Sequence, residues 1–478
     1  MIKSGFLKDK IITALCLLAV AALAMAATAA CGGSLVQGDT FWHLKVGEWV
    51  LSLKEIPKAD PFSWTAPGAP WHAHEWLWEI LAAVLWRVCG TRGLWVLTAA
   101  GVALAAAFSF LLAARRSGSP AWSLACAPVS LASLAAFISA RPHVLALSFL
   151  TAWLWLLDLA REKRWAAACL PVLAAVWANV HASAPLGPLM GIVMLSADAL
   201  AKKQGVVARQ FAGAAASFLA TGLNPWGFGV WGFALKVGSH PEMINTINEW
   251  LSPDFHSPFM LPVLAAAILL FLLPRGDAAF RLLAAGAFLA GLVSMRHLAV
   301  FAVLWPAAAA PALAARFSGP GMKIAAATAL VLTALGLTAT VSSPPPAWPG
   351  SGFPEAAVSY MVREGLTGRV FNYYTWGGYL IWRGVEPFID GRADMYVLSG
   401  SGVMDDYDRA EGILRPPEPD AVFAKWGVKT VLMPSDSWMA LYLSRNPDWR
   451  EVYRDNAAVV FARTVGPGSK GLNAANIQ

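Results

Sequence analysis

A carboxylate and a group of imidazoles follow the first long apolar stretch of the chain. Asp39 comes soon after the apolar run 11–30. A carboxylate in that place could deprotonate an acceptor hydroxyl or hold a divalent cation against a phosphate. Aspartate is also favoured as a helix N-cap, which is the purely structural alternative. We take Asp39 as the candidate catalytic residue and keep the capping role open.

The sequence His72-Ala73-His74-Glu75 gathers two imidazoles and a carboxylate in one short segment. Such groups could contribute to a divalent-metal site or bind a substrate phosphate. Hydrogen bonding at the membrane interface is the alternative, because the sequence reveals no further ligands. A divalent cation is therefore left open, and no cofactor is assigned with certainty.

The composition indicates where these groups lie. The chain of 478 residues is 57% hydrophobic and 14% charged, and repeated long apolar runs are typical of a polytopic membrane protein. From residue 342 onward, 13 Lys and Arg stand against 15 Asp and Glu, so the formal charge of +7 arises in the apolar part. There the basic residues cluster between apolar runs, which sets membrane topology and does not indicate a nucleic-acid partner. The five cysteines show no disulfide or metal spacing.

With the basic clusters taken as cytoplasmic, the first part of the chain (1–341) is predicted to be a membrane domain. The N-terminus would be cytoplasmic and the tail outside. Basic residues, an apolar run and Ala-Met-Ala-Ala resemble a cleaved signal peptide, but 11–30 is long enough to span, so we expect an uncleaved first helix. The eleven predicted spans are 11–30, 93–114, 120–139, 144–160, 166–180, 182–200, 208–222, 258–274, 280–296, 297–316 and 322–341.

The first outer loop, 31–92, is expected to hold two helices that lie along the membrane surface. Trp42, Val46 and Trp49 begin an apolar stripe at helical spacing, and a second helix is predicted over 74–88. If this second segment crossed the membrane, later basic clusters would lie outside, so we expect that it does not cross.

This topology places all eight histidines in outer loops or at outer helix ends. Arg141 and Arg296 are the predicted anion clamps, since guanidinium binds phosphate through a planar fork. Snorkelling towards lipid headgroups is the alternative for each arginine. Glu249 and Asp254 are further acids of an outer loop, with a solvated loop favoured for Asp254. The predicted substrate- or phosphate-binding residues are His43, Glu75, Arg141, His143, His181, Arg296 and His297.

The tail is predicted to be a soluble α/β domain over 354–478, joined by a linker over 342–353. We expect a helix over 355–364 and a mixed sheet flanked by helices. Gly377-Gly378 is predicted to form a hairpin turn. The segment Phe388-Ile389-Asp390-Gly391-Arg392-Ala393-Asp394 is predicted to be a charged turn, with sugar or cation binding as the alternative. The predicted strands are 369–374, 379–382, 387–389, 430–433, 451–454 and 458–463.

One stretch of the first outer loop also resembles a known superfamily. It comprises Asp39-Thr40-Phe41-Trp42-His43-Leu44-Lys45, then Glu48, Pro57 and Asp60-Pro61-Phe62. It resembles the first outer loop of GT-C membrane glycosyltransferases, most of all the oligosaccharyltransferase catalytic subunit, and more distantly the aminoarabinose and protein O-mannosyl transferases. The resemblance implies inverting sugar transfer from a polyprenyl-phosphate or polyprenyl-diphosphate donor, with Asp39 near the reaction centre.

Two departures from the oligosaccharyltransferase pattern narrow this resemblance. The short loop 139–144, Ser-Ala-Arg-Pro-His-Val, has no acidic residue, which weakens a metal site of that kind. The Trp-Trp-Asp acceptor motif is absent from the tail, which argues against asparagine glycosylation of protein.

The sequence therefore predicts a GT-C-type glycosyltransferase of a bacterial inner (cytoplasmic) membrane. Its expected partners are a lipid-linked sugar donor, membrane lipids, and an envelope glycan, lipid or protein acceptor. The alternative is a non-catalytic membrane protein, either a transporter of a lipid-linked intermediate or an assembly partner in envelope-polysaccharide synthesis.

Overall fold

The computed structural model describes residues 2–32, 35–201, 204–273, 276–317, 322–342, 348 and 352–464. The chain divides into two compact units. The first comprises Met1–Gln37, Val46–Ile56 and His72–Trp348, and the second comprises Gly38–Lys45, Pro57–Trp71 and Pro349–Gln478. Most of the predicted linker, and Lys202, Lys203 and Arg275 of the basic clusters, lie outside the described residues.

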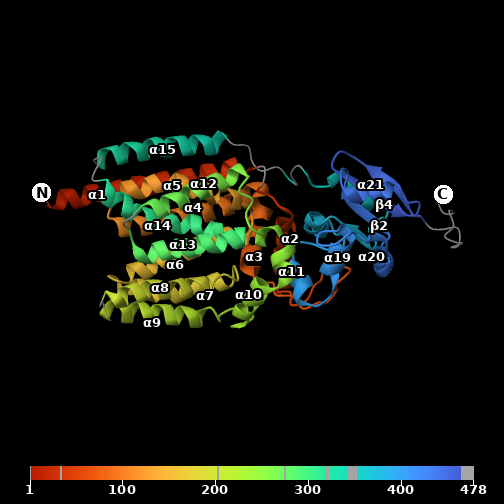
Figure 1. Ribbon diagram of the computed structural model, residues 1–478, viewed down its shortest axis with the longest axis horizontal. Coiled ribbons are helices and arrows are strands. Elements are labelled where there is room, and N and C mark those ends of the chain that lie inside the picture. Colours follow the sequence, from red (N-terminus) through yellow and green to blue (C-terminus); the bar gives the residue numbers. More distant parts are fainter. Residues whose placement is uncertain are drawn as a thin grey trace. The chain divides into compact units, whose positions relative to one another are not determined.

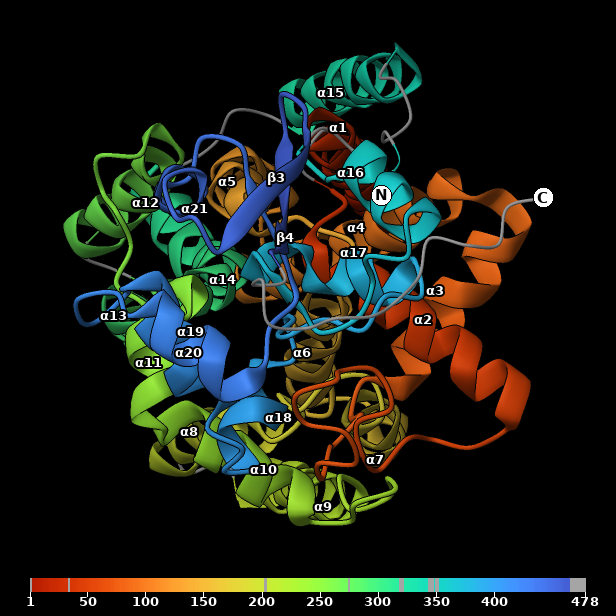
Figure 2. The same cartoon turned by 90° about the vertical axis from the view of Figure 1, so that its right-hand side faces the viewer.

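The first unit is built of apolar helices, which Figure 1 shows lengthwise and Figure 2 end-on. Each of the eleven predicted spans coincides with a helix. They are α1 (Ile2–Ala30), α4 (Thr91–Ser117), α5 (Pro120–Leu134), α6 (Pro142–Leu159), α7 (Arg164–Ala178), α8 (Leu186–Leu200), α9 (Gln204–Ala220), α12 (Leu261–Leu272), α13 (Ala278–Val293), α14 (Leu298–Arg316) and α15 (Met322–Ser342).

Five helical segments of the described chain are long and apolar enough to cross a membrane: Lys10–Ala30, Thr91–Ser117, Pro120–Phe137, Pro142–Leu159 and Met295–Arg316. Several other apolar helices are shorter, at 10–17 residues. A multi-pass membrane protein follows from these helices, whereas the number of eleven crossings stays a prediction.

Helices also form at both predicted surface positions. They are α2 (Gly38–Leu53), whose first half belongs to the second unit, and α3 (Trp76–Cys89). Their location on a membrane surface stays a prediction. Shorter elements, α10 (Gly229–Ser239), α11 (Pro241–Thr246), η3 (Asn248–Trp250) and η5 (Met295–His297), lie in the predicted outer loops.

Local sequence explains where these helices begin and end. Gly118 ends α4 in the left-handed conformation (φ 64°), which glycine adopts without a Cβ clash. Ser119 then caps α5, accepting a hydrogen bond from the Trp122 amide, and Pro120 follows at the first helical position. Pro142 likewise opens α6. Small residues allow close packing, since a Cβ on Gly191 of α8 would lie 2.8 Å from the Trp153 ring of α6.

The predicted cytoplasmic helix ends are joined by ion pairs. Asp158 of α6 is 2% exposed and accepts from Arg115 and Arg116 of α4, at 3.1 Å each. Arg116 also reaches Asp277 before α13 at 2.7 Å, and Arg161 reaches Asp198 of α8 at 2.8 Å. These basic residues therefore do more than bias topology. They connect four helices, and they neutralise Asp158 and Asp198, which are buried.

The second unit carries a mixed sheet, as predicted. Its four strands lie in the order β1-β2-β4-β3, which the sequence did not predict. β1 (Val370–Asn372) pairs in parallel with β2 (Thr430–Pro434), which pairs antiparallel with β4 (Ala458–Arg463), and β4 pairs antiparallel with β3 (Trp449–Arg454). Its helices are α16 (Glu355–Arg363), α17 (Gly377–Trp382), α18 (Ala393–Leu398), α19 (Val403–Glu411), α20 (Pro419–Trp426) and α21 (Trp438–Ser444), and α19 and α20 lie side by side (Figure 1).

Two strand predictions are wrong. Segment 379–382 lies in α17, and 387–389 contributes one isolated bridge between Pro387 and Val370. Short runs that are apolar on all sides do not distinguish a strand from a buried helix. The predicted hairpin at Gly377-Gly378 is also wrong, because both glycines begin α17. A Cβ at Gly377 would overlap the Ile389 carbonyl oxygen, so this glycine permits close packing and does not form a turn.

Most residues of α14 are buried, and this helix contains Pro306 and Pro311. Proline has no amide hydrogen, so Pro306 deprives the Ala302 carbonyl, four residues earlier, of its helical donor. The Ser130 hydroxyl of α5 donates to this carbonyl at 2.7 Å. A neighbouring helix thus satisfies a polar group that has no access to water.

We predict that Ser130→Ala lowers the stability of the detergent-purified protein by about 1–3 kcal/mol, because the Ala302 carbonyl loses its donor. In a Pro306→Ala background the new amide supplies that donor, and the same substitution should cost much less. Ser133→Ala is the control, since the buried Ser133 hydroxyl has no partner among the described residues. Thermal unfolding measures all four variants, and equal losses with and without Pro306 would contradict this account.

Candidate functional site

Asp39 lies in the second unit, against the tail. α2 begins at Gly38, so Asp39 is inside the first turn and is not the N-cap. Its Oδ1 atom accepts a hydrogen bond from Trp42 Nε1 at 3.1 Å. A Cβ on Gly391 of the tail would overlap Asp39 Oδ1 and lie 3.1 Å from Trp42 Nε1. The half-buried carboxylate is thus held between its own helix and a glycine of the tail.

The neighbouring charges of the tail are buried, which corrects the predicted charged turn at 388–394. Asp390 is 0% and Arg392 1% exposed. Arg392 donates Nε to Asp390 Oδ1 at 2.8 Å and Nη2 to Asp390 Oδ2 at 2.7 Å, while Nη1 donates to Asp60 Oδ1 at 2.6 Å. Burial alone would lower the pKa of Arg392, but Asp390 and Asp60 outweigh it and raise this pKa well above its usual range.

Asp60 belongs to a turn of the predicted first outer loop that packs onto the tail. It accepts from the Phe62 amide at 2.9 Å and from the Ser63 amide and hydroxyl. The Arg392 guanidinium lies over the rings of Phe62 and Trp71, at 5.2 and 4.8 Å from the ring centroids. Every oxygen of the two buried carboxylates is therefore hydrogen-bonded, as buried charges require.

His43, predicted to bind substrate, is 1% exposed and also lies in the second unit. Its ring centroid is 3.6 Å from that of Trp42. His43 therefore packs against Trp42, the residue whose indole donates to Asp39, and it can help to hold that indole in place.

The other predicted residues lie in the first unit, where two arginines meet one acid. Arg141, just before α6, forms an ion pair with Glu249 of η3. Arg296 of η5 lies over the Trp250 ring at 4.4 Å. Burial would raise the pKa of Glu249, but Arg141 and Arg296 outweigh it and lower this pKa to about 2. Glu249 is therefore ionised at neutral pH and neutralises one of the two guanidinium charges.

Glu75 lies between two histidines. Its Oε1 atom is 3.6 Å from His181 Nε2 and 3.7 Å from His74 Nε2. Burial, with His74 and Arg296 nearby, lowers the pKa of His181 well below its ordinary value, so this ring is neutral at pH 7. The Ser183 amide donates to His181 Nδ1 at 3.1 Å, which places the ring proton on Nε2, facing Glu75.

These groups form one electrostatic cluster in the first unit. His181 is influenced by His74, His143, Arg141 and Arg296, and Arg296 by Glu249, Arg141 and Glu75. We call it the arginine–histidine cluster: His74, Glu75, Arg141, His143, His181, Glu249 and Arg296. Its two arginines and the Nε2–H of His181 are donors that suit an anionic group such as a phosphate.

His143 and His297 are held at the edge of this cluster. His143 Nε2 lies 2.8 Å from the Phe137 carbonyl oxygen. His297 Nδ1 lies 3.2 Å from the Ser294 carbonyl oxygen, and its ring contacts Trp250. In each histidine, one ring nitrogen is therefore engaged in a hydrogen bond with a backbone carbonyl oxygen.

The metal-binding prediction for His72, His74 and Glu75 gains no support from the geometry. The His72 ring stacks on Phe233 with centroids 5.3 Å apart and lies 5.9 Å from Trp226. Within the described ranges, no group of three or more His, Cys, Asp or Glu side chains is placed to hold a metal ion.

Two partners do not follow from the sequence. Glu249 has only its adjacency to Trp250 as a local signal of a role in a site. Asp60 forms an ion pair with Arg392, and the two residues are 332 positions apart. No local pattern reveals a pairing of that range.

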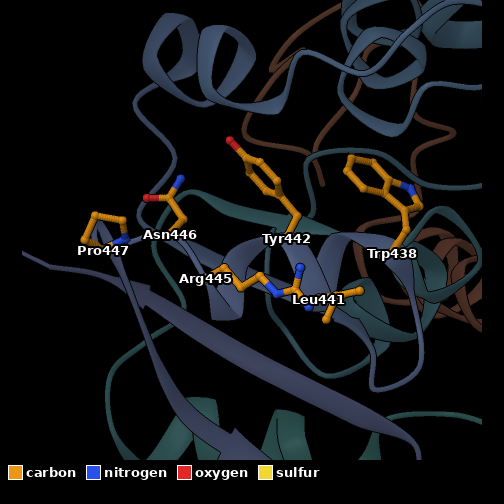
Figure 3. A pocket seen from close by; sticks show the side chains of 6 residues that line it. All are labelled: Trp438, Leu441, Tyr442, Arg445, Asn446 and Pro447. Atoms are coloured by element: carbon orange, nitrogen blue, oxygen red, sulfur yellow. The ribbon is translucent and has the colours of Figure 1, made fainter.

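A shallow hollow of about 540 Å³ lies on α21 of the second unit (Figure 3). Trp438, Leu441 and Tyr442 line it, with Arg445, Asn446 and Pro447. The Tyr442 hydroxyl and the Asn446 amide both donate to Asp420, so these polar groups are already engaged. No predicted site residue lines the hollow.

Comparison with solved structures identifies the fold. The chain superposes on the archaeal oligosaccharyltransferase AglB from Archaeoglobus fulgidus, solved with an inhibitory peptide and a dolichol-phosphate, with a TM-score of 0.58 at 12% identity. The match covers 87% of this chain and 69% of AglB. ArnT from Cupriavidus metallidurans, solved with undecaprenyl phosphate, matches with a TM-score of 0.52 at 13% identity over 98% of this chain and 99% of ArnT.

The chain shares the fold of AglB and ArnT, as the resemblance to GT-C membrane glycosyltransferases implies. The predicted resemblance is thereby confirmed at the level of fold. No family model and no curated protein matches the sequence. The GT-C fold comprises both parts of the chain, since the match to ArnT covers nearly all of it.

The depressed pKa of Glu249 predicts a pH-dependent contribution to stability. A carboxyl whose folded pKa is about 2, against 4.5 ordinarily, stabilises the fold above about pH 4.5 and loses this contribution as the pH falls towards 2. The contribution is of the order of 1 kcal/mol, because the side chain is partly exposed and solvent screens the pair.

We therefore expect Glu249→Gln to lower the melting temperature at pH 7, and the gap to wild type to shrink between pH 5 and pH 3. Glu242→Gln in α11 controls for the loss of one acidic charge. Thermal unfolding in detergent across this pH range is the measurement. A gap that is the same at pH 7 and pH 3 would contradict the ion pair.

Proposed function

We propose that this protein is a membrane glycosyltransferase that moves a sugar from a polyprenyl-phosphate-linked donor to an envelope glycan, lipid or protein acceptor. The observation that carries the proposal is the arginine–histidine cluster, a phosphate-compatible group at the ends of apolar helices in a GT-C fold. The proteins with this fold named above were solved with prenyl phosphates, dolichol-phosphate in AglB and undecaprenyl phosphate in ArnT. We place the reaction at the outer face of a bacterial inner membrane, with the N-terminus cytoplasmic.

In this proposal Asp39 accepts the proton of the acceptor hydroxyl or orients that hydroxyl. The hydroxyl oxygen of the acceptor then attacks the anomeric carbon of the donor sugar. The bond from the sugar to the phosphate breaks, and the phosphate leaves with the bonding electrons. Within the first unit, Arg296, Arg141 and the neutral His181 are the donors that we assign to the departing phosphate oxygens. His43 supports the Asp39 helix turn through Trp42.

The non-catalytic alternative also has an observation in its favour. Glu249 neutralises Arg141, so the cluster offers less net positive charge than two free arginines would. A carrier that releases an intact lipid-linked intermediate needs only weak phosphate binding, and it needs no general base. The two functions therefore differ in their dependence on Asp39.

We predict that Asp39→Asn lowers sugar transfer by at least about 100-fold, the usual scale for loss of a general base. The assay follows a radiolabelled undecaprenyl-phosphate-linked sugar, prepared from bacterial membranes, into an acceptor fraction. Asp436→Asn, which changes an exposed aspartate between β2 and α21, is the matched control and should retain full activity. Wild-type rates in Asp39→Asn would refute the catalytic role and favour the carrier.

A further inference from the structure

The Asp390-Gly391-Arg392 loop buries two charged side chains and packs closely against its neighbours. Its two charged residues are buried and joined to Asp60, and each charge is satisfied by bidentate or multiple hydrogen bonds. The Tyr396 hydroxyl of α18 adds a further donor to Asp390 Oδ2 at 2.7 Å. Burying charges gives little net stability, even when they are well paired. The arrangement therefore calls for a reason beyond holding the tail together.

Between the two charged residues, Gly391 presents its bare Cα to the Asp39 carboxylate. A Cβ at this position would overlap Asp39 Oδ1 and lie 2.8 Å from Asp39 Cγ. Two further glycines, Gly38 and Gly378, also allow the backbone of the tail to approach the start of α2 closely. A Cβ on Gly378 would overlap the Gly38 carbonyl oxygen, and one on Gly38 would overlap the Thr375 carbonyl oxygen.

A second line of contacts leads from the same loop to Asp39. The Arg392 guanidinium lies over the Trp71 ring, and Trp71 packs edge-on against Trp42 with centroids 6.1 Å apart. Trp42 Nε1 then donates to Asp39 Oδ1. The Asp39 carboxylate is thus fixed by a hydrogen bond on one side and by Gly391 on the other, and both supports rest on Arg392.

We infer that the Asp390-Gly391-Arg392 loop, together with Trp42, positions Asp39 for its reaction. This inference rests on the proposed function, since it gives the tail a role in the same reaction. None of these residues needs to touch substrate. They set the direction of one carboxylate, and a shift of about 1 Å in a reacting group costs roughly 100-fold in rate.

Gly391→Ala is the direct test. The methyl group displaces the Asp39 carboxylate, so kcat should fall about 10- to 100-fold while KM for the lipid-linked donor stays within about twofold. The rate is divided by the amount of protein that binds undecaprenyl phosphate, which removes any loss from misfolding. Gly368→Ala is the matched control, because nothing lies within 4 Å of a Cβ there and its φ is ordinary.

Trp42→Phe provides a second test, because it keeps an aromatic ring at this position and removes the Nε1 donor. We expect a severalfold fall in kcat per folded protein, with KM for the lipid-linked donor retained. An unchanged kcat in this variant overturns the positioning role, even where Gly391→Ala fails to fold.

The two hypotheses fail differently. Full activity of Asp39→Asn overturns the proposed function, and the positioning inference falls with it. An inactive Asp39→Asn with full kcat in Gly391→Ala overturns the positioning inference alone. A loss in Gly391→Ala that appears only in KM also contradicts it, because displacement of Asp39 should affect the chemical step.

Discussion

The second unit depends on the ion pairs that Arg392 makes with Asp60 and Asp390. These three side chains are almost completely buried, and removing one partner would leave an uncompensated charge, at a cost of about 3–5 kcal/mol. These ion pairs also attach a segment from the first part of the chain to the second unit. Asp60 lies on Pro57–Trp71 of the first outer loop, so this segment folds as part of the tail. The Thr65 hydroxyl, which donates to the Phe388 carbonyl at 2.6 Å, and Trp64, which donates to the Val370 carbonyl at 3.1 Å, extend the same attachment.

Much of the fold follows from local pattern. Long apolar runs predicted the helices of the first unit because a helix satisfies its own backbone in an apolar environment. The β-branched run at 458–463 predicted β4 with its bounds, and Asp455-Asn456 predicted the preceding turn. Prediction failed at 379–382 and 387–389, where short apolar segments are buried on every side and periodicity carries no information.

Charge was harder to predict than hydrophobicity. Asp390 and Arg392 have the composition of a solvated turn, yet both are buried, and the second carboxylate that pairs with Arg392 is Asp60, 332 positions away. The same holds in the first unit, where Arg141 stands at a helix start but its charge is balanced by Glu249 from a distant loop. A sequence shows which residues are ionisable, whereas their pairing depends on the tertiary fold. For that reason the sequence predicted most members of the arginine–histidine cluster but not the pairing of Arg141 with Glu249.

We propose that the arginine–histidine cluster binds the phosphate of a prenyl-phosphate carrier. An electron cryomicroscopy map of the full chain in lipid nanodiscs with undecaprenyl phosphate would locate that phosphate. We expect phosphate density within hydrogen-bonding reach of Arg296 and His181. Phosphate density at another place on the protein, with these two side chains unoccupied, would contradict it.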